Sequence, residues 1–262
     1  MPGIYVMAII TLAASAGLWG GLVYFLSGRR SAYLWLILSG LPLSVFVNLF
    51  IKKPLGLAVS AWAGIPPPWG PSSPVWFLLF LYLLSPVFEE AIKILPLFLP
   101  WVRGLLADRS SALWAGMTLG IGFGLGEAAY LAYGIARNPH FAHLPWYLFT
   151  GYFGERLIVC FLHGVMTAVA VSGIRQGFGP GLLGYLAAMG LHGLINIGAV
   201  LYQFKIIPLA ATQLPFLASL VLLAFIFESL RRTASREPGA ADKAEEVVYY
   251  QRTVLRHPVE KA

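Results

Sequence analysis

Seven stretches of this sequence are long and apolar enough to cross a lipid bilayer, and they take up most of the 262 residues. A transmembrane helix needs about 20 consecutive, mostly apolar residues. The runs are 4–26, 33–51, 75–100, 112–135, 155–174, 180–201 and 208–230. The chain is 58% hydrophobic and 11% charged, whereas soluble globular chains are about 45–50% apolar and about 25% charged. We therefore expect an all-α fold, a polytopic transmembrane helical bundle of about seven spans.

The basic residues are distributed unevenly between the two sets of loops, which predicts the orientation of the chain. Alternate loops and the C-terminal segment hold Arg29, Arg30, Arg103, Arg109, Arg175, Arg231, Arg232 and Arg236. The opposite loops hold only Lys52, Lys53, Arg137 and Lys205. The more basic loops are expected in the cytoplasm. The N-terminus and segment 52–74 should then lie outside and the C-terminus inside, with the plasma membrane as the expected location. The net charge of +7 is explained as a topology signal, so we expect no nucleic-acid partner.

The chain divides by composition into a transmembrane domain, 1–232, and a polar segment, 233–262, for which we expect a flexible cytoplasmic tail. The aromatic segment 141–153 is either an interfacial piece or an early start of the fifth span. Cys160 is the single cysteine, which excludes an intrachain disulfide and a cysteine-rich zinc site.

Few ionisable side chains lie inside the apolar runs, and each one is costly there. They are Glu89, Glu90, Lys93, Glu127, Arg156, His163 and His192, joined by the neutral amide of Asn196. A charge at the centre of a membrane helix costs about 2.5–3.5 kcal/mol. These side chains are therefore expected to face one another or a water-filled cavity.

Helical spacing suggests how some of these groups are arranged. Glu89 and Lys93 are four residues apart, the spacing of a favourable helical ion pair. If this pair forms, the carboxylate of Glu90 has no partner within its own helix. Arg156 is one possible partner for it. His163 lies two turns after Arg156 and should share its helix face. In the next run, the same argument places His192 and Asn196 on one face.

Glycines recur once per turn in the fourth run, at Gly116, Gly120 and Gly124. Small residues at this spacing allow two membrane helices to pack closely. We expect this packing to bring Glu127, at the end of the same pattern, close to a neighbouring helix.

Histidine and glutamate side chains at membrane depth suit two kinds of chemistry. Both are zinc ligands, and a catalytic zinc ion usually has three protein ligands and a water. A glutamate can also act as a general base on water. A single buried histidine is usually an ordinary core residue, but two histidines in consecutive runs with three interior glutamates favour a site. The HExxH pattern of a zinc-binding helix is absent.

Four segments, in order, resemble motifs of the PrsW-type intramembrane proteases, relatives of the type II CAAX-prenyl proteases and the bacterial CPBP proteins. EEAIK (89–93) resembles the EExxK motif, and GFGLGE (122–127) resembles the glycine- and aromatic-rich motif that ends in glutamate. RLIVCFLHGVMTAVAVSG (156–173) resembles the R-x6-H segment, and LHGLIN (191–196) resembles the final HxxxN/D motif. The resemblance covers about residues 75–200. Ala128 stands where the family often has asparagine.

The resemblance implies an intramembrane endopeptidase whose protease-like domain is 1–232. Its partners would be the lipid bilayer and a membrane-anchored protein or peptide substrate, such as a single-span anti-sigma factor. Glu89 or Glu90 would activate water, and Asn196 would donate a hydrogen bond to the developing oxyanion.

The resemblance also implies roles for the other interior side chains. His163 and His192 would bind Zn²⁺ or polarise the water and the substrate carbonyl. Glu127 would be a third zinc ligand or an orienting carboxylate, and Lys93 and Arg156 would balance charge. Zn²⁺ is the expected cofactor, and a metal-free glutamate–histidine pair is the alternative.

Two other classes of function fit the same composition. A non-enzymatic membrane scaffold or binding protein could keep the polar groups for helix packing, and should tolerate Glu→Gln substitutions. A proton-coupled transporter could use glutamates and histidines as a relay, and should show substrate-dependent proton flux.

Overall fold

The computed structural model describes residues 1–28 and 30–236, and every regular element within them is helical. The elements are α1 (Gly3–Leu26), η1 (Ser31–Tyr33), α2 (Leu34–Phe46), η2 (Val47–Lys52), α3 (Lys53–Trp62), α4 (Val75–Leu84), η3 (Ser85–Glu89), α5 (Glu90–Lys93), η4 (Leu95–Phe98), α6 (Pro100–Arg103), α7 (Arg109–Ala136), η5 (Trp146–Phe149), α8 (Thr150–Arg175), α9 (Phe178–Gln203), η6 (Leu209–Thr212) and α10 (Gln213–Ser235). Of the η elements, η2 and η3 are π-helical and the others are 3₁₀ helices. Together they form seven stretches long and apolar enough to span a membrane, which confirms the predicted seven-span, all-α bundle.

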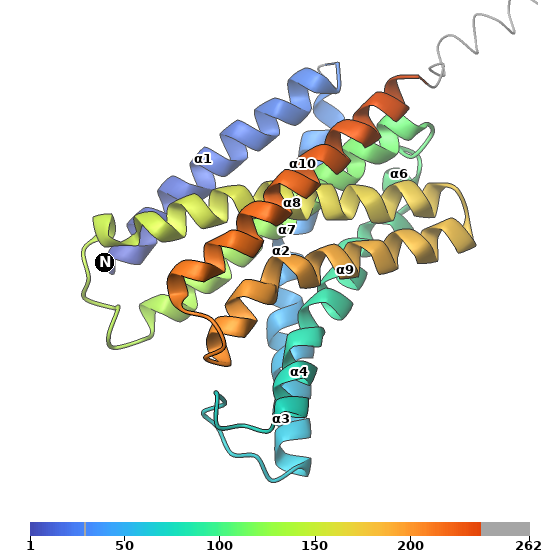
Figure 1. The fold of residues 1–262 in the computed structure, drawn as a ribbon. Helices are drawn as coiled ribbons and strands as arrows, with labels where there is room; N and C mark the ends of the chain where they lie inside the picture. Colours follow the sequence, from blue (N-terminus) through green and yellow to red (C-terminus); the bar gives the residue numbers. More distant parts are fainter. Residues whose placement is uncertain (29, 237–262) are drawn as a thin grey trace, which may run out of the picture.

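Helices α7 and α8 form the centre of the bundle and are the most buried of the spans. They pack on each other more extensively than any other pair of elements. Helix α2 covers another face of α7, and α9 runs beside α8 (Figure 1). Side chains on α7 and α8 therefore lie in the interior, where polar groups need partners from neighbouring spans.

The predicted glycine stripe lies at the interface between α7 and α8. A Cβ on Gly116 would lie 2.5 Å from the Cα of Ala168. Gly120 faces the backbone carbonyl of His163 at a distance that leaves no space for a Cβ. The close packing expected from the small-residue pattern is confirmed.

Two local features fix where the central helices begin and turn. The side chain of Asp108 accepts a hydrogen bond of 2.7 Å from the backbone nitrogen of Ser111, and so caps the start of α7. Only residues 176–177 separate α8 from α9. Gly177 has a φ of 120° there, which favours glycine. This tight link makes α8 and α9 antiparallel neighbours and brings their faces together.

The second span is longer than predicted. The sequence predicts a span over 33–51 and an outer loop over 52–74, but the helical stretch runs from Ser31 to Trp62. The adjacent charges of Lys52 and Lys53 do not end it, because Lys52 is neutralised by a partner in the third span. The loop between the second and third spans is therefore only 63–74, and α3 and α4 extend side by side beyond the other helices (Figure 1).

The third span is not one regular helix. The predicted run 75–100 is divided into α4, the π-helical η3, the short α5 and the 3₁₀ helix η4. Pro86 lies in η3 and Pro96 in η4. Proline lacks a backbone N–H and disturbs the regular α-helical hydrogen bonding. Glu89 and Glu90 lie at this irregular part of the span.

The remaining boundaries differ from the predicted ones by a few residues. The fifth span begins with η5 at Trp146, so the second half of the aromatic segment 141–153 is an early start of that span. Helix α10 continues to Ser235, past the predicted domain boundary at 232. Most of the predicted tail, 237–262, lies outside the described residues.

Candidate active site

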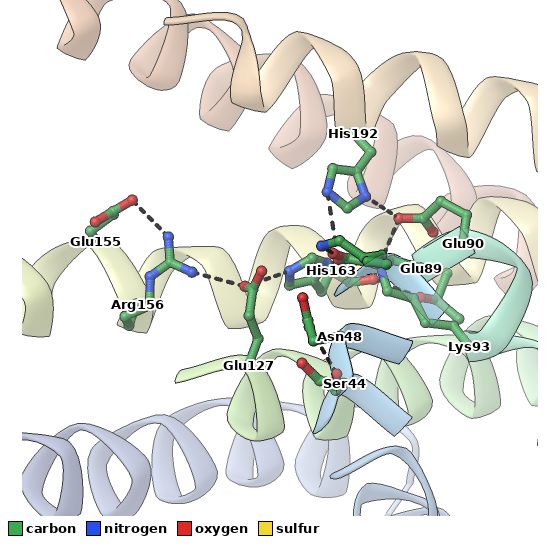
Figure 2. A network of polar contacts seen from close by, with 12 residues as sticks. Ser44, Asn48, Glu89, Glu90, Lys93, Glu127, Glu155, Arg156, His163 and His192 are labelled. Carbon is green, nitrogen blue, oxygen red and sulfur yellow. Dashed lines mark hydrogen bonds and ion pairs between the residues drawn. The ribbon is translucent and has the colours of Figure 1, made fainter. Parts of the chain in front are cut away.

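Glu89 and Glu90 are buried side chains at the point where η3 passes into α5 (Figure 2). The Nζ atom of Lys93 lies 2.6 Å from Oε1 of Glu90. The predicted pair between Glu89 and Lys93 is therefore wrong. A π-helical turn hydrogen-bonds at a spacing of five residues, so the four-residue spacing assumed for a regular α-helix does not hold at Glu89.

The cation that neutralises Glu89 comes from the second span. Nζ of Lys52 lies 2.5 Å from Oε1 of Glu89, and the side chains are 18% and 1% exposed. Because the sequence predicts a loop at Lys52, this residue is missed as part of the site. One signal could have found it, since Lys52 lies four residues after Asn48, another polar residue inside the second apolar run. The amide of Asn48 donates a hydrogen bond of 2.8 Å to the backbone oxygen of Ser44.

His192, on α9, approaches both glutamates. Its Nδ1 lies 2.6 Å from Oε1 of Glu90, and its Nε2 lies 3.8 Å from Oε2 of Glu89. The expectation that the interior ionisable side chains face one another is confirmed here, and the contact between His192 and Glu90 is direct. Because an ionised carboxylate only accepts hydrogen bonds, we assign the imidazole proton to Nδ1, and Nε2 keeps its lone pair.

His163, on α8, uses both of its ring nitrogens. Its Nδ1 lies 2.8 Å from Nζ of Lys93, and its Nε2 lies 3.1 Å from Oε2 of Glu127. An ammonium group has no lone pair, so Nδ1 accepts from Lys93 and we assign the proton to Nε2, which donates to Glu127. The ring of Phe123 packs against the same groups, with its centroid 5.2 Å from that of His163 and 4.6 Å from Nζ of Lys93. His163 is thus held in one orientation by charged partners on both sides.

Arg156 bridges two carboxylates. Its Nη1 lies 2.8 Å from Oε2 of Glu127, and its Nη2 lies 2.6 Å from Oε1 of Glu155. The shared face predicted for Arg156 and His163 is confirmed, because both bind Glu127. The possible pairing of Arg156 with the remaining third-span glutamate is wrong, because Lys52 takes that position.

Each of the three interior carboxylates therefore has a cation of its own. The pairs are Glu89–Lys52, Glu90–Lys93 and Glu127–Arg156. Pairing offsets much of the cost of removing these charges from water. The Oε2 atoms of Glu89 and Glu90 are buried and accept no hydrogen bond from the described residues. Buried polar atoms are normally satisfied, so these two oxygens are suited to accept from a water or a substrate.

A cavity of about 500 Å³ adjoins the two histidines. Its polar wall contains Glu127, Arg156, His163, His192 and Asn196. Its apolar wall comes from α8, α9 and α10, with Leu162, Met166, Ile195, Phe216 and Leu217 among the lining side chains. The lining does not include Glu89 or Glu90, so a molecule in the cavity meets the imidazoles and Asn196 first. The shared face predicted for His192 and Asn196 is confirmed, since both line this cavity.

Two groups of side chains in the described part of the chain could supply three metal ligands. They are Glu90, His163 and His192, and Glu89, Glu127 and His163, with donor atoms within 4.8 Å of one another. The predicted zinc ligands His163, His192 and Glu127 are split between the two groups, because the two nitrogens of His163 face in different directions.

Neither group fits Zn²⁺ as it stands. Each carboxylate already has a cation beside it. A zinc ligand must offer a free lone pair. His163 and His192 have four ring nitrogens between them. Only Nε2 of His192 has a lone pair that no hydrogen bond uses.

No protein-family model matches this chain, and neither does any curated protein or solved structure. The resemblance to the PrsW-type proteases therefore stays a prediction based on the four motifs.

Proposed function

We propose that this protein is an intramembrane endopeptidase of the PrsW type, which hydrolyses a peptide bond in a membrane-anchored protein. The observation that supports this most strongly is the contact of Glu89 and Glu90 with His192, which lines one cavity together with His163 and Asn196. Peptide hydrolysis needs a group that takes a proton from water. It also needs donors that stabilise the oxyanion of the tetrahedral intermediate.

Glu89 is the proposed general base, with His192 as its partner. The separation of 3.8 Å between Oε2 of Glu89 and Nε2 of His192 is too long for a hydrogen bond, and a water placed near both atoms could donate to each. Glu90 binds the opposite nitrogen of His192. A carboxylate in that position fixes the orientation and tautomer of a catalytic imidazole. This arrangement assigns water activation to Glu89 and positioning to Glu90.

The carbonyl of the substrate would bind on the cavity side of this pair. Attack of the water on the carbonyl carbon transfers one proton to Glu89 and places negative charge on the carbonyl oxygen. Asn196 lines the cavity one helical turn after His192, where its amide could donate to that oxygen. The proton on Glu89 then passes to the leaving nitrogen as the peptide bond breaks, which yields a carboxylic acid and an amine.

The metal-free version of this mechanism is favoured over the zinc version. Lys52, Lys93 and Arg156 already neutralise the three carboxylates, so a divalent ion would add uncompensated positive charge. Glu127 then orients His163 rather than binding metal, in keeping with their distance of 3.1 Å.

The proposed substrate is a membrane-spanning segment, such as that of a single-span anti-sigma factor. The cavity is walled by apolar side chains from three spans, which suits an apolar segment that arrives from the bilayer. The proposed location is the plasma membrane, with the N-terminus outside and the C-terminus in the cytoplasm. With Lys52 and Lys53 inside a helix, Arg137 and Lys205 are the only arginine and lysine residues in the proposed outer loops, all of which the structure describes, which strengthens the charge bias.

The test is cleavage of a single-span reporter by the purified protein in detergent, comparing Glu89→Gln, Glu90→Gln and His192→Ala with the unaltered chain. We expect Glu89→Gln to lower the rate by at least about 10²-fold, the usual contribution of a general base. Glu228→Gln is the matched control, because Glu228 pairs with Arg231 and does not line the cavity. Full activity of both Glu89→Gln and His192→Ala would refute this site as the catalytic centre, and absence of cleavage by the unaltered protein would favour a scaffold.

The same assay with phenanthroline separates the two mechanisms. The metal-free site should keep full activity in the chelator. Loss of activity that added Zn²⁺ restores would establish the zinc version instead.

A proton-coupled transporter is the second candidate, because polar contacts run continuously from Glu155 through Arg156, Glu127 and His163 to Lys93. An arginine does not release its proton, so Arg156 interrupts a proton relay along this path. Substrate-dependent proton flux in liposomes, without cleavage, would favour the transporter.

A further inference from the structure

The ammonium group of Lys93 lies among the donor atoms of a possible metal site. The three candidate ligands Glu90, His163 and His192 bring their donor atoms within 4.8 Å of one another. Nζ of Lys93 lies 2.6 Å from Oε1 of Glu90 and 2.8 Å from Nδ1 of His163. The side chain of Lys93 is fully buried. The positive charge at this point is therefore supplied by the chain itself.

The contacts of Lys93 use the electron pairs that a metal ion would need. Its ammonium group only donates, so it engages the lone pair of Nδ1 on His163. It also neutralises Glu90, whose Oε1 additionally accepts from His192. A divalent ion bound to the same atoms would lie beside the ammonium group, and two cations at such a distance repel strongly in a buried environment.

We propose that Lys93 takes the place of a metal ion, and that Glu90, His163 and His192 form a latent divalent-cation site closed by this lysine. Removal of the ammonium group frees Nδ1 of His163 and leaves Glu90 as a buried carboxylate without a cation. A buried, unpaired charge is strongly unfavourable. Two imidazoles and one carboxylate form the ligand set of a catalytic zinc site, so the variant protein should recruit Zn²⁺ or Co²⁺.

Metal binding by the purified full-length protein tests this inference. The unaltered protein, Lys93→Ala, Lys93→Arg and Lys53→Ala are stripped with a chelator, exposed to Zn²⁺ or Co²⁺, and freed of unbound ion. Bound metal is counted by elemental analysis, and the Co²⁺ samples are read by visible absorption. Lys53→Ala is the matched control, because Lys53 is exposed and adjacent in sequence to the ion-paired Lys52.

We expect Lys93→Ala to bind about one equivalent of Zn²⁺, with the absorption of four-coordinate Co²⁺. The unaltered protein, Lys93→Arg and Lys53→Ala should bind none. Adding His163→Ala to Lys93→Ala should abolish the binding. If Lys93→Ala does not fold, Lys93→Gln, which has a polar side chain one atom shorter than lysine and carries no charge, replaces it.

Two results would overturn the inference. One is stoichiometric Zn²⁺ in the unaltered protein that His163→Ala removes. The other is a folded Lys93→Ala or Lys93→Gln protein that binds no metal. Because the readout is bound metal, either result is independent of whether the protein cleaves the reporter.

Discussion

Lys52 and Glu89 are 37 residues apart in the sequence, and their charged atoms lie 2.5 Å apart. Lys52 ends the π-helical η2 of the second span, and Glu89 ends the π-helical η3 of the third. Short π-helical segments inside α-helices often occur at functional sites. Here they pair a lysine and a glutamate from different spans, and Glu89 also lies 3.8 Å from Nε2 of His192, so this ion pair belongs to the candidate site.

Replacing Lys52 should destabilise the protein, because Glu89 would remain as a buried carboxylate without a cation. We expect Lys52→Met to lower the free energy of unfolding by about 3 kcal/mol, as expected when one partner of a buried ion pair is removed. The measurement is equilibrium unfolding in mixed micelles. Combining Lys52→Met with Glu89→Gln should restore most of the loss, because the unpaired charge is then gone. Lys53→Met, at the exposed neighbouring lysine, should change stability by less than about 0.5 kcal/mol.

Replacing a glycine at the interface between α7 and α8 should also destabilise the bundle. A Cβ on Gly116 would lie 2.5 Å from the Cα of Ala168, so Gly116→Ala must push the two helices apart. We expect a loss of about 1–3 kcal/mol, the usual cost of overpacking a core. Gly134→Ala in the same helix is the control, because a Cβ there meets nothing within 4 Å. Equal stability of the two variants would contradict the packing described for α7 and α8.

Asn196 provides a test of oxyanion stabilisation in the proposed mechanism. We expect Asn196→Ala to lower kcat by about 10²–10³-fold, the typical effect of removing an oxyanion donor, with a smaller change in KM. Gln213→Ala removes another side-chain amide that lines the same cavity, from α10, and should leave kcat nearly unchanged. A rise in KM without a fall in kcat for Asn196→Ala would indicate a role in substrate binding only.

The orientation of the chain can be tested by cysteine labelling in intact cells. The single native cysteine, Cys160, is buried, so labelling should report only on introduced cysteines. We expect Ser72→Cys, in the loop 63–74 between the second and third spans, to react from outside. Ala240→Cys, in the C-terminal segment, should react only after the membrane is opened. Labelling of both positions from the same side would contradict a seven-span topology.

The sequence by itself determined that this is a polytopic membrane protein, and it identified most members of the polar cluster but not Lys52. The length of an apolar run is counted along the chain, so the seven spans could be predicted without knowledge of packing. The cost of a charge in hydrocarbon is equally local. Because of this cost, polar partners could be expected for Glu89, Glu90, Glu127, His163 and His192.

The tertiary structure decided which partners they meet. The α-helical spacing predicted the wrong cation for Glu89, because the π-helical turn at Ser85–Glu89 changes the register of the third span. The sequence places Lys52 just beyond the end of the second span, because the carboxylate that neutralises it lies 37 residues away in the chain. Both errors have one physical reason. Whether a charge is tolerated inside a membrane protein depends on its neighbours in space, and those neighbours come from other spans.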